Sequence, residues 1–311
     1  MSHDVSIILS TYLSDNYLKN YYNNINELID VANIQLVHVM NDPTSEEILY
    51  KEKFLELQSK KSKKIFEYKY LIVKRESLYA SWNRAIKLSD AKLISISNVD
   101  DIRYKEGLQA QISFFREYGE LLLLGGYFNV RTKNDLIIHD NIENTVIRKT
   151  DFFAEMHVGP FFIWTNPTFF GREQLFFDEQ FYVAGDFYFQ IRFASMGTVK
   201  MLNKNVGEYL NVNTGLSTGS INQSIEGQVI YQRYNVIDKK IFFFSFLFFK
   251  RKYFPSFFKI GSVSYALKEV CPEINFIKKI NANREKFYFD YISDMTTLLK
   301  LIIKKFIFNR K

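Results

Sequence analysis

Apolar runs and amphipathic stretches alternate through the first third of the chain. Runs rich in β-branched and apolar residues predict strands at 5–12, 34–40 and 66–73, and a fourth strand opens the stretch LISISNVDDIRY at 93–104. Between them, apolar residues recur at helical spacing over 16–31, 45–61 and 76–89. Strands that alternate with helices of this length indicate βαβ units, so we expect an α/β fold with a mostly parallel sheet.

Beyond residue 104 the pattern loosens. It predicts a helix at 105–118, a strand with a glycine break at 121–132, an irregular aromatic stretch at 150–184, a helix from Asp186 to Gly197 and a strand at 198–212. From about residue 223 the chain becomes basic, aromatic and helical in tendency. We therefore expect an α/β domain over residues 1–222 and a helical C-terminal extension over residues 223–311.

Each of the four predicted strands in the first third ends in small or polar residues. These ends are Ser10-Thr11-Tyr12, Asn41-Asp42, Arg75-Glu76 and Asn98-Val99-Asp100-Asp101. In mostly parallel sheets, ligands bind outside the carboxyl ends of the strands. We therefore expect the four ends to meet at one edge of the sheet and to carry the chemistry.

Composition narrows the class of protein. Hydrophobic residues make up 47% of the 311 residues, enough for a sizeable core. A single cysteine, Cys271, excludes an intramolecular disulfide and points to a reducing compartment. The N-terminus lacks the basic start and apolar core of a secretory signal, and the longest apolar block, 241–249, is far shorter than the roughly 20 residues that span a bilayer. We expect a cytoplasmic chain that does not cross a membrane.

The positive charge lies in the extension. Residues 223–311 hold 17 Lys and Arg against 7 Asp and Glu, a balance of +10, which leaves −3 for residues 1–222 of a chain whose net charge is +7. An anionic partner is therefore expected at the extension. Segments 239–259 and 297–311 interleave basic and large apolar residues, which suits either an anionic membrane interface or packing on the domain or in a homodimer.

Three acidic sites, one of them an adjacent pair, admit both a chemical and a purely structural interpretation. Adjacent Asp100 and Asp101 can hold a divalent cation, or one of them can cap the following helix. Asp42 can accept hydrogen bonds from a nucleoside, or form a turn before Pro43. Asp186, at the start of a predicted helix, can be a general base or an N-cap. The spacing alone leaves these alternatives open.

Taken together, the motifs resemble glycosyltransferase family 2, whose members have the GT-A fold. The matching stretches are VSIILSTY, LVHVMNDPTSEE, ESLYASWNRAIKLSDAKLISISNVDDIRY, FDEQFYVAGDFYFQIRFASMG and GEYLNVNTGLST. They occur in the family's order and cover about residues 4–220. The resemblance implies a GT-A fold, Rossmann-like, with a mixed, mostly parallel sheet flanked by helices.

The resemblance also implies site residues for an inverting transfer of a sugar from a nucleotide-diphosphate sugar to a hydroxyl group. Asp186 would be the catalytic base, and Asp100 and Asp101 would hold Mn²⁺ or Mg²⁺. The residues expected to hold the nucleotide sugar are Thr11, Tyr12, Asp42, Asn83, Asn98 and Asp100. Phe161, Trp164 and Phe169 offer rings on which an acceptor sugar can stack, although core packing explains them equally well.

Several positions depart from the family pattern. Asn98 replaces the first aspartate of the metal motif, Gly185 replaces the glutamate before Asp186, and Trp82 occupies an arginine position. Nothing resembles the motif of processive synthases, so a non-processive enzyme is expected.

Short relatives with this layout build bacterial surface polysaccharides such as O-antigen or capsule, and the acceptor here would be a glycan or a lipid-linked molecule. This analogy suggests the same role here, with the extension held peripherally at the inner face of the cell membrane. The departures keep an alternative open, namely a non-catalytic nucleotide-sugar-binding scaffold in an assembly complex. Nucleic acid is not an expected partner because the domain is net acidic and lacks a recognised nucleic-acid-binding fold.

Overall fold

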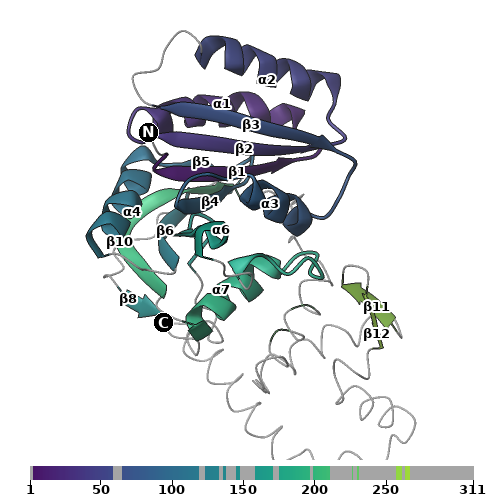
Figure 1. Ribbon diagram of the computed structural model, residues 1–311, viewed down its shortest axis with the longest axis vertical. Coiled ribbons are helices and arrows are strands. Elements are labelled where there is room, and N and C mark those ends of the chain that lie inside the picture. Colours follow the sequence, from purple (N-terminus) through teal and green to yellow (C-terminus); the bar gives the residue numbers. More distant parts are fainter. Residues whose placement is uncertain are drawn as a thin grey trace, which may run out of the picture. The chain divides into compact units, whose positions relative to one another are not determined.

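A computed structural model describes most of the predicted α/β domain and a small part of the extension (Figure 1). The described residues are 3–58, 65–118, 123–132, 136–137, 145–147, 158–170, 175–196, 199–210, 226, 230, 257–260 and 263–266. Among them, no helix combines the length and the apolar character that crossing a membrane requires.

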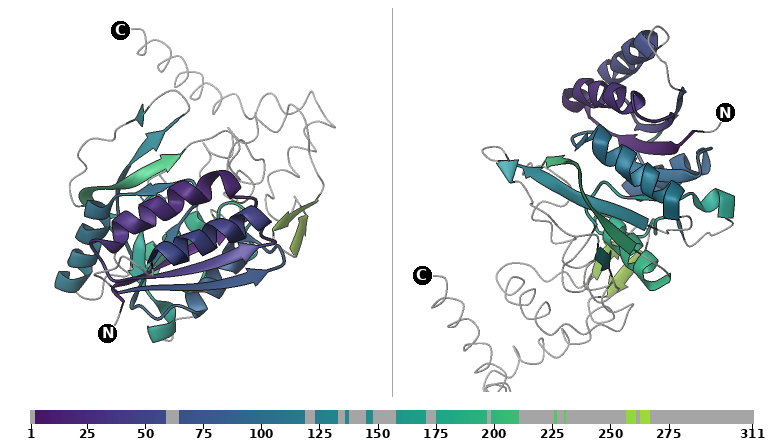
Figure 2. Two further views of the ribbon diagram at one scale, coloured as in Figure 1. Left: turned by 90° about the horizontal axis from the view of Figure 1, so that it is seen from above. Right: turned by 90° about the vertical axis from the view of Figure 1, so that its left-hand side faces the viewer.

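The first third of the chain forms the expected alternation of strands and helices. Its elements are β1 (Val5–Thr11), α1 (Asp15–Ile29), β2 (Ile34–Asn41), α2 (Ser45–Gln58), β3 (Phe66–Val73), α3 (Leu78–Lys87) and β4 (Leu93–Ser97). Helices α1 and α2 lie on one face of the strands, and α3 lies on the other (Figures 1 and 2). This is the arrangement that right-handed crossovers give when the strand order reverses at β1.

The main sheet also contains β5 (Ile102–Arg103), β6 (Leu123–Arg131), β9 (Ile163–Thr165) and β10 (Val199–Leu210). It is mixed, with the order β3-β2-β1-β4-β9-β6-β10-β5. The long registers are parallel and join β1 to β2 and β4, β2 to β3, and β6 to β10. The antiparallel pairs are short, two or three residues each. The predicted α/β fold with a mostly parallel sheet is therefore confirmed.

The second half of the domain completes this sheet. Its elements are β5 (Ile102–Arg103), α4 (Lys105–Tyr118), β6 (Leu123–Arg131), β7 (Leu136–Ile137), β8 (Thr145–Ile147), β9 (Ile163–Thr165), α6 (Pro167–Phe170), α7 (Gly185–Met196) and β10 (Val199–Leu210).

The stretch expected to be irregular contains a central strand, so that prediction is wrong for part of its length. Strand β9 runs antiparallel between β4 and β6. It has only three residues, and Phe161 to Trp164 are all buried, so no alternation of apolar and polar residues marks it in the sequence.

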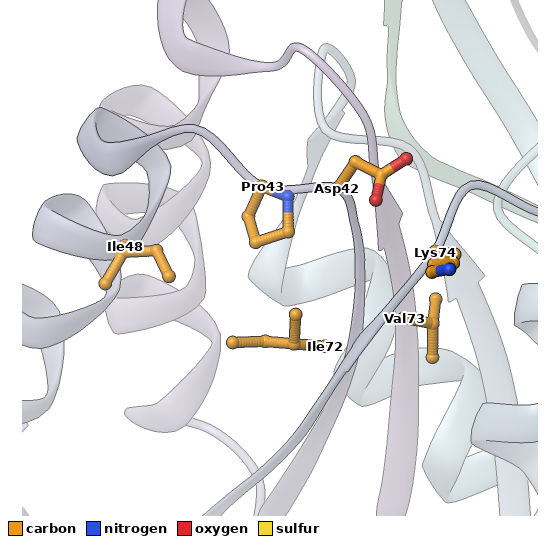
Figure 3. A pocket seen from close by; sticks show the side chains of 6 residues that line it. All are labelled: Asp42, Pro43, Ile48, Ile72, Val73 and Lys74. Atoms are coloured by element: carbon orange, nitrogen blue, oxygen red, sulfur yellow. The ribbon is translucent and has the colours of Figure 1, made fainter.

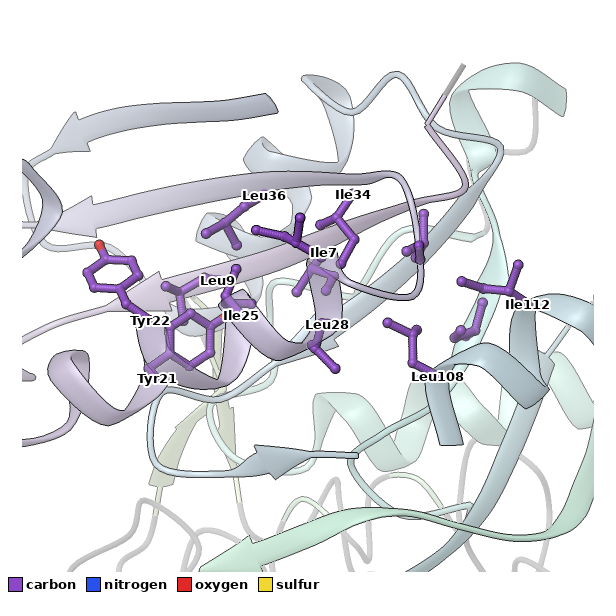
Figure 4. Close-up of a cluster of buried hydrophobic side chains, with 14 of the residues drawn as sticks. Ile7, Leu9, Tyr21, Tyr22, Ile25, Leu28, Ile34, Leu36, Leu108 and Ile112 are labelled. Atoms are coloured by element: carbon purple, nitrogen blue, oxygen red, sulfur yellow. The ribbon is translucent and has the colours of Figure 1, made fainter. Parts of the chain in front are cut away.

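A continuous apolar layer joins α1 to the sheet. Tyr21, Ile25 and Leu28 of α1 pack over Ile7 and Leu9 of β1, and the cluster extends to α4 (Figure 4). All five side chains are almost fully buried. Residues three or four positions apart in α1 thus pack on residues two positions apart in β1. This match determines which face of β1 lies against the helix.

The chain separates into two compact units, Met1–Ile237 and Asp238–Lys311. Helical residue Glu226 belongs to the first unit, although the predicted boundary lies at 222/223. In the second unit, β11 (Phe257–Ile260) pairs antiparallel with β12 (Val263–Ala266), so these residues are strands where a helical extension was expected. Apart from Glu226 and Ile230, the rest of the helical prediction for 223–311 lies outside the described residues, as does the membrane interpretation of 297–311 and of 239–259 up to residue 256.

Strand β3 forms one edge of the main sheet. Tyr70 and Ile72 are about half exposed there, and the Lys51 ammonium lies 4.0 Å from the centre of the Tyr70 ring. Glu67 and Lys69 alternate with the apolar positions of this strand.

Candidate active site at the carboxyl edge of the sheet

The carboxyl ends of β1, β2 and β3 meet, as the sequence predicted. The backbone N–H of Arg75 donates to Oδ2 of Asp42 at 3.0 Å. The Arg75 guanidinium donates to the Tyr12 hydroxyl at 3.1 Å and lies 4.0 Å from the centre of that ring. Tyr12, Asp42 and Arg75 therefore form one exposed cluster with an aromatic face, a carboxylate and a cation.

Asn41 holds these strand ends in register. Its Nδ2 donates to the carbonyl of Thr11, and its Oδ1 accepts from the N–H of Glu76, at 3.2 and 3.1 Å. Two residues in the loops of this edge, Leu13 and Asp42, have positive φ angles of 51° and 41°. Aspartate tolerates this conformation better than leucine does, so the loop after β1 is locally strained at Leu13.

Thr11 turns its side chain into the protein. Its hydroxyl is buried and lies 2.8 Å from Nε2 of His38, whose Nδ1 lies 2.7 Å from the Tyr68 hydroxyl. Of the predicted nucleotide contacts in the loop after β1, it is therefore Tyr12 that presents its side chain to solvent.

His38 makes the stability of the fold sensitive to acid. Burial, with a smaller effect of the Lys51 charge, lowers the pKa of His38 to about 3, whereas an unfolded histidine titrates near 6.5. Between these values only the unfolded chain binds the proton, so the free energy of unfolding falls as the pH falls. Between pH 7 and pH 5 we expect His38 to remove about 2 kcal/mol of stability.

Urea unfolding of the wild type and of His38→Gln at both pH values checks this expectation. Glutamine keeps a hydrogen-bond donor and acceptor but does not titrate, so the variant should lose about 2 kcal/mol less than the wild type. The ionisable side chains around the imidazole, those of Lys51, Tyr22 and Tyr68, are common to both proteins. If the free energy of unfolding falls equally with pH in both proteins, His38 is not the group responsible.

Asn98 and Asp101 form a pair within the loop after β4. Nδ2 of Asn98 donates to Oδ2 of Asp101 at 2.9 Å, and the N–H of Leu210 donates to its Oδ1 at 3.0 Å. Burial, followed by the charge of Asp100, raises the pKa of Asp101 to about 8. An amide at position 98 can donate to this carboxyl, where an aspartate would repel it, which gives a physical reason for the departure at Asn98.

Asp100 is the more accessible of the two adjacent acids. It is half-buried, and burial raises the pKa of its carboxyl, whereas Asp101 is 3% exposed and uses both oxygens in hydrogen bonds. Within the described part of the chain, no three His, Cys, Asp or Glu side chains gather as a metal site. A hard divalent ion that binds mainly through phosphate oxygens needs only one or two protein carboxylates, so Asp100, with Asp101 behind it, fits such an ion.

Asp186 lies in the first turn of α7 and contacts α3. Its Oδ1 accepts from its neighbour Phe187 N–H at 2.8 Å and lies 3.4 Å from the Tyr79 hydroxyl oxygen. Gly185 precedes it because the Tyr79 ring fills the space beside it, and a Cβ there would come within 2.5 Å of that ring. Helix α3 follows directly from Arg75 and Glu76, which brings Asp186 toward the same edge.

Asn83 is engaged inside the protein. Nδ2 donates to the Phe177 carbonyl at 2.8 Å and to the Glu179 carboxylate at 2.9 Å, and Oδ1 accepts from the Phe177 N–H at 2.8 Å. The side chain is 4% exposed. Asn83 therefore holds the segment before α7 against α3 and does not present its side chain to a ligand.

The three rings suggested as an acceptor platform separate into two groups. Phe161 and Trp164 are at most 1% exposed, so the structure covers their faces with protein. Trp164 packs with Phe162, Phe177 and Phe189 at centroid distances of 5.2 to 5.9 Å. Phe169 is 51% exposed and is the ring of the three that solvent reaches.

A pocket of about 590 Å³ lies beside Asp42. Its lining combines the Asp42 carboxylate and Lys74 with aliphatic side chains from the ends of β2 and β3 and from α2 (Figure 3). The lining residues are Asp42, Pro43, Ile48, Ile72, Val73 and Lys74. A flat ring with polar edges matches this mixture of apolar wall and charged rim.

Sequence reasoning assigned no role to three side chains of this region. Arg75 contacts Tyr12, Tyr79 contacts Asp186, and Glu226 bonds to the segment before α7. The sequence did place Arg75 among the polar residues at the end of a predicted strand. Tyr79 and Glu226 gave no local signal, because each reaches residues more than forty positions away.

The architecture of the described residues is that of the GT-A fold, as the sequence led us to expect. The chain is similar to the solved structure of the fragment 1–349 of S. aureus TarS in complex with UDP-GlcNAc, with 15% identity and a TM-score of 0.60. The match covers 76% of this chain and 66% of that fragment. A separate match to a longer TarS chain covers 81% of this chain and 44% of that one.

A second similar structure is the mannosyltransferase PcManGT from Pyrobaculum calidifontis in complex with GDP-Man and Mn²⁺. It is 11% identical, with a TM-score of 0.55 over 97% of this chain and 81% of that one. No protein-family model and no curated protein sequence matches the chain.

Proposed function

We propose that this protein is an inverting, non-processive glycosyltransferase of family 2 that moves a sugar from a nucleotide-diphosphate sugar to a hydroxyl group. The observation that carries the proposal is the cluster of Tyr12, Asp42 and Arg75 at the carboxyl edge of a GT-A sheet. The proteins whose structures it resembles bind UDP-GlcNAc or GDP-Man, which supports a donor of this class.

The side chains of the cluster suit the parts of such a donor. Asp42 can accept hydrogen bonds from a nucleoside, and the Tyr12 ring offers a stacking face. The Arg75 cation can attract the diphosphate. Three other predicted residues would support this surface through hydrogen bonds. Thr11 bonds to His38, Asn98 bonds to Asp101, and Asn83 bonds to the segment before α7.

A divalent ion belongs to this proposal. Asp100 would hold it directly, with Asp101 behind Asp100, and when bound the ion would offset the negative charge of the diphosphate. Mn²⁺ accompanies the donor in the similar mannosyltransferase, which supports this assignment.

Asp186 is the proposed general base. Its place in the first turn of α7 leaves the carboxylate half-buried, beside the Tyr79 hydroxyl. From there it can take the proton of an acceptor hydroxyl as that oxygen attacks the sugar from the face opposite the leaving diphosphate. Phe169 remains the candidate ring for an acceptor sugar.

We further propose a role in bacterial surface-polysaccharide synthesis, with a glycan or lipid-linked acceptor at the inner face of the cell membrane. The basic and aromatic composition of residues 223–311 supports this placement.

The deciding experiment is a turnover screen of the full chain with nucleotide-diphosphate sugars, with Mn²⁺ or with a chelator. Release of nucleoside diphosphate from one donor is expected with Mn²⁺, and the chelator should lower it by at least about tenfold. Asp100→Ala should lower it similarly with Mn²⁺ present.

Binding of a donor without any turnover would overturn the enzymatic proposal and leave a nucleotide-sugar-binding scaffold. Full activity in the chelator would overturn the metal assignment alone.

A further inference from the structure

One carboxylate binds three consecutive backbone N–H groups just before α7. Oε1 of Glu226 accepts from Tyr182 at 2.6 Å, and Oε2 accepts from Val183 and Ala184 at 2.8 and 2.6 Å. Glu226 is 1% exposed and lies 42 to 44 positions from its partners in the sequence. Hydrogen bonds to an ionised acceptor are stronger than neutral ones, so this is a firm attachment.

The bonded segment leads directly to Asp186. The next N–H, that of Gly185, donates to the Tyr79 hydroxyl at 2.8 Å, and this hydroxyl donates to the Val183 carbonyl at 2.6 Å. Four successive N–H groups are thus bound by side chains from two distant parts of the chain. Four consecutive N–H groups can reach these two acceptors only in one backbone conformation. That conformation determines the position at which α7 begins.

Glu226 also interacts electrostatically with the end of this segment. Burial raises the pKa of its carboxyl, the three N–H groups lower it, and the charge of Asp186 raises it. The two carboxylates are therefore near enough to influence each other, although each has its own hydrogen-bond donors.

We propose that Glu226 is a positioning residue for Asp186, which it controls by fixing the backbone of residues 182–184. The inference rests on the proposed function, because it takes Asp186 as the base of the transfer. A reacting group that is displaced by about 1 Å can lose on the order of 100-fold in rate, so a loosened segment should slow the chemical step. Donor binding at Tyr12, Asp42 and Arg75 should stay unchanged, since none of them contacts this segment in the described hydrogen bonds.

The test compares Glu226→Gln with Gln35→Ala in the full chain. Gln35 is a matched control: it is fully buried, it accepts from the Ser6 hydroxyl and the Asp90 N–H at 2.8 Å each, and it lies at the amino ends of the strands. Glu226→Gln is expected to lower kcat by about 10- to 100-fold with the donor KM within about twofold. Gln35→Ala should keep kcat within about twofold while lowering thermal stability.

A second measurement does not depend on activity. Hydrogen exchange of the amides of residues 182–184 should be faster in Glu226→Gln and unchanged in Gln35→Ala.

Wild-type kcat in a folded Glu226→Gln protein would overturn the inference, as would an equal loss of kcat in Gln35→Ala. A wild-type chain that turns over no donor would instead overturn the proposed function and the catalytic part of this inference. Amide exchange would then still decide whether Glu226 holds the segment.

Discussion

Asp186→Asn is expected to lower kcat by about 100- to 10,000-fold, the range that general base catalysis contributes. Asparagine keeps an oxygen that can accept from the Phe187 N–H, so the local structure should persist. It cannot take up a proton at neutral pH. Steady-state turnover of the donor identified in the screen, together with its Kd from calorimetry, measures both effects.

Asp178→Asn provides the matched control for this variant. Asp178 lies in the same segment before α7, and its Oδ1 accepts from the Gln180 N–H at 3.1 Å, a bond that asparagine can also accept. We expect its kcat within about twofold of the wild type. Near-normal transfer by Asp186→Asn, with normal donor binding, would exclude Asp186 as the base.

Trp164→Ala is expected to destabilise the fold by about 3–5 kcal/mol, the usual cost of truncating a buried tryptophan. The indole is 0% exposed and is surrounded by Phe162, Phe177 and Phe189, so its removal leaves a cavity that these rings cannot fill. Equilibrium unfolding in urea gives the difference in the free energy of unfolding.

Phe169→Ala separates the two interpretations of the aromatic stretch. Because Phe169 is 51% exposed, its truncation should change stability by less than about 0.5 kcal/mol. If Phe169 receives the acceptor sugar, its loss should raise the acceptor KM at unchanged stability. A stable Trp164→Ala protein with a raised acceptor KM would contradict the core assignment of Trp164.

The sequence sufficed for those parts of the fold in which periodicity is strong. Strands β1 to β3 and helices α1 to α3 agree with the expected ranges to within a few residues, because runs of seven or eight residues rich in apolar and β-branched side chains indicate strands and apolar residues at helical spacing indicate helices. Strand β9 escaped prediction because it has only three residues, and the continuous burial from Phe161 to Trp164 gives no alternation that would mark a strand. Its place between β4 and β6 depends on pairing partners that are distant in the sequence.

For the site, the sequence predicted which edge of the sheet carries the polar residues but not which of their atoms are available. Convergence of strand ends follows from parallel pairing, and the contacts among Tyr12, Asp42 and Arg75 agree with it. The direction of the Thr11 and Asn83 side chains could not be deduced in this way. Each is decided by a partner from another element, His38 for Thr11 and the Phe177 backbone for Asn83.

The position of β3 at the edge of the sheet has a practical consequence for anyone who handles this protein. An edge strand offers backbone donors and acceptors to a second molecule, and half-exposed Tyr70 and Ile72 add apolar surface for such self-association. Charged residues on an edge strand oppose aggregation, and Glu67 and Lys69 supply them here. These two charges should be left in place when the surface is re-engineered for crystallisation, even though neither contacts the candidate active site.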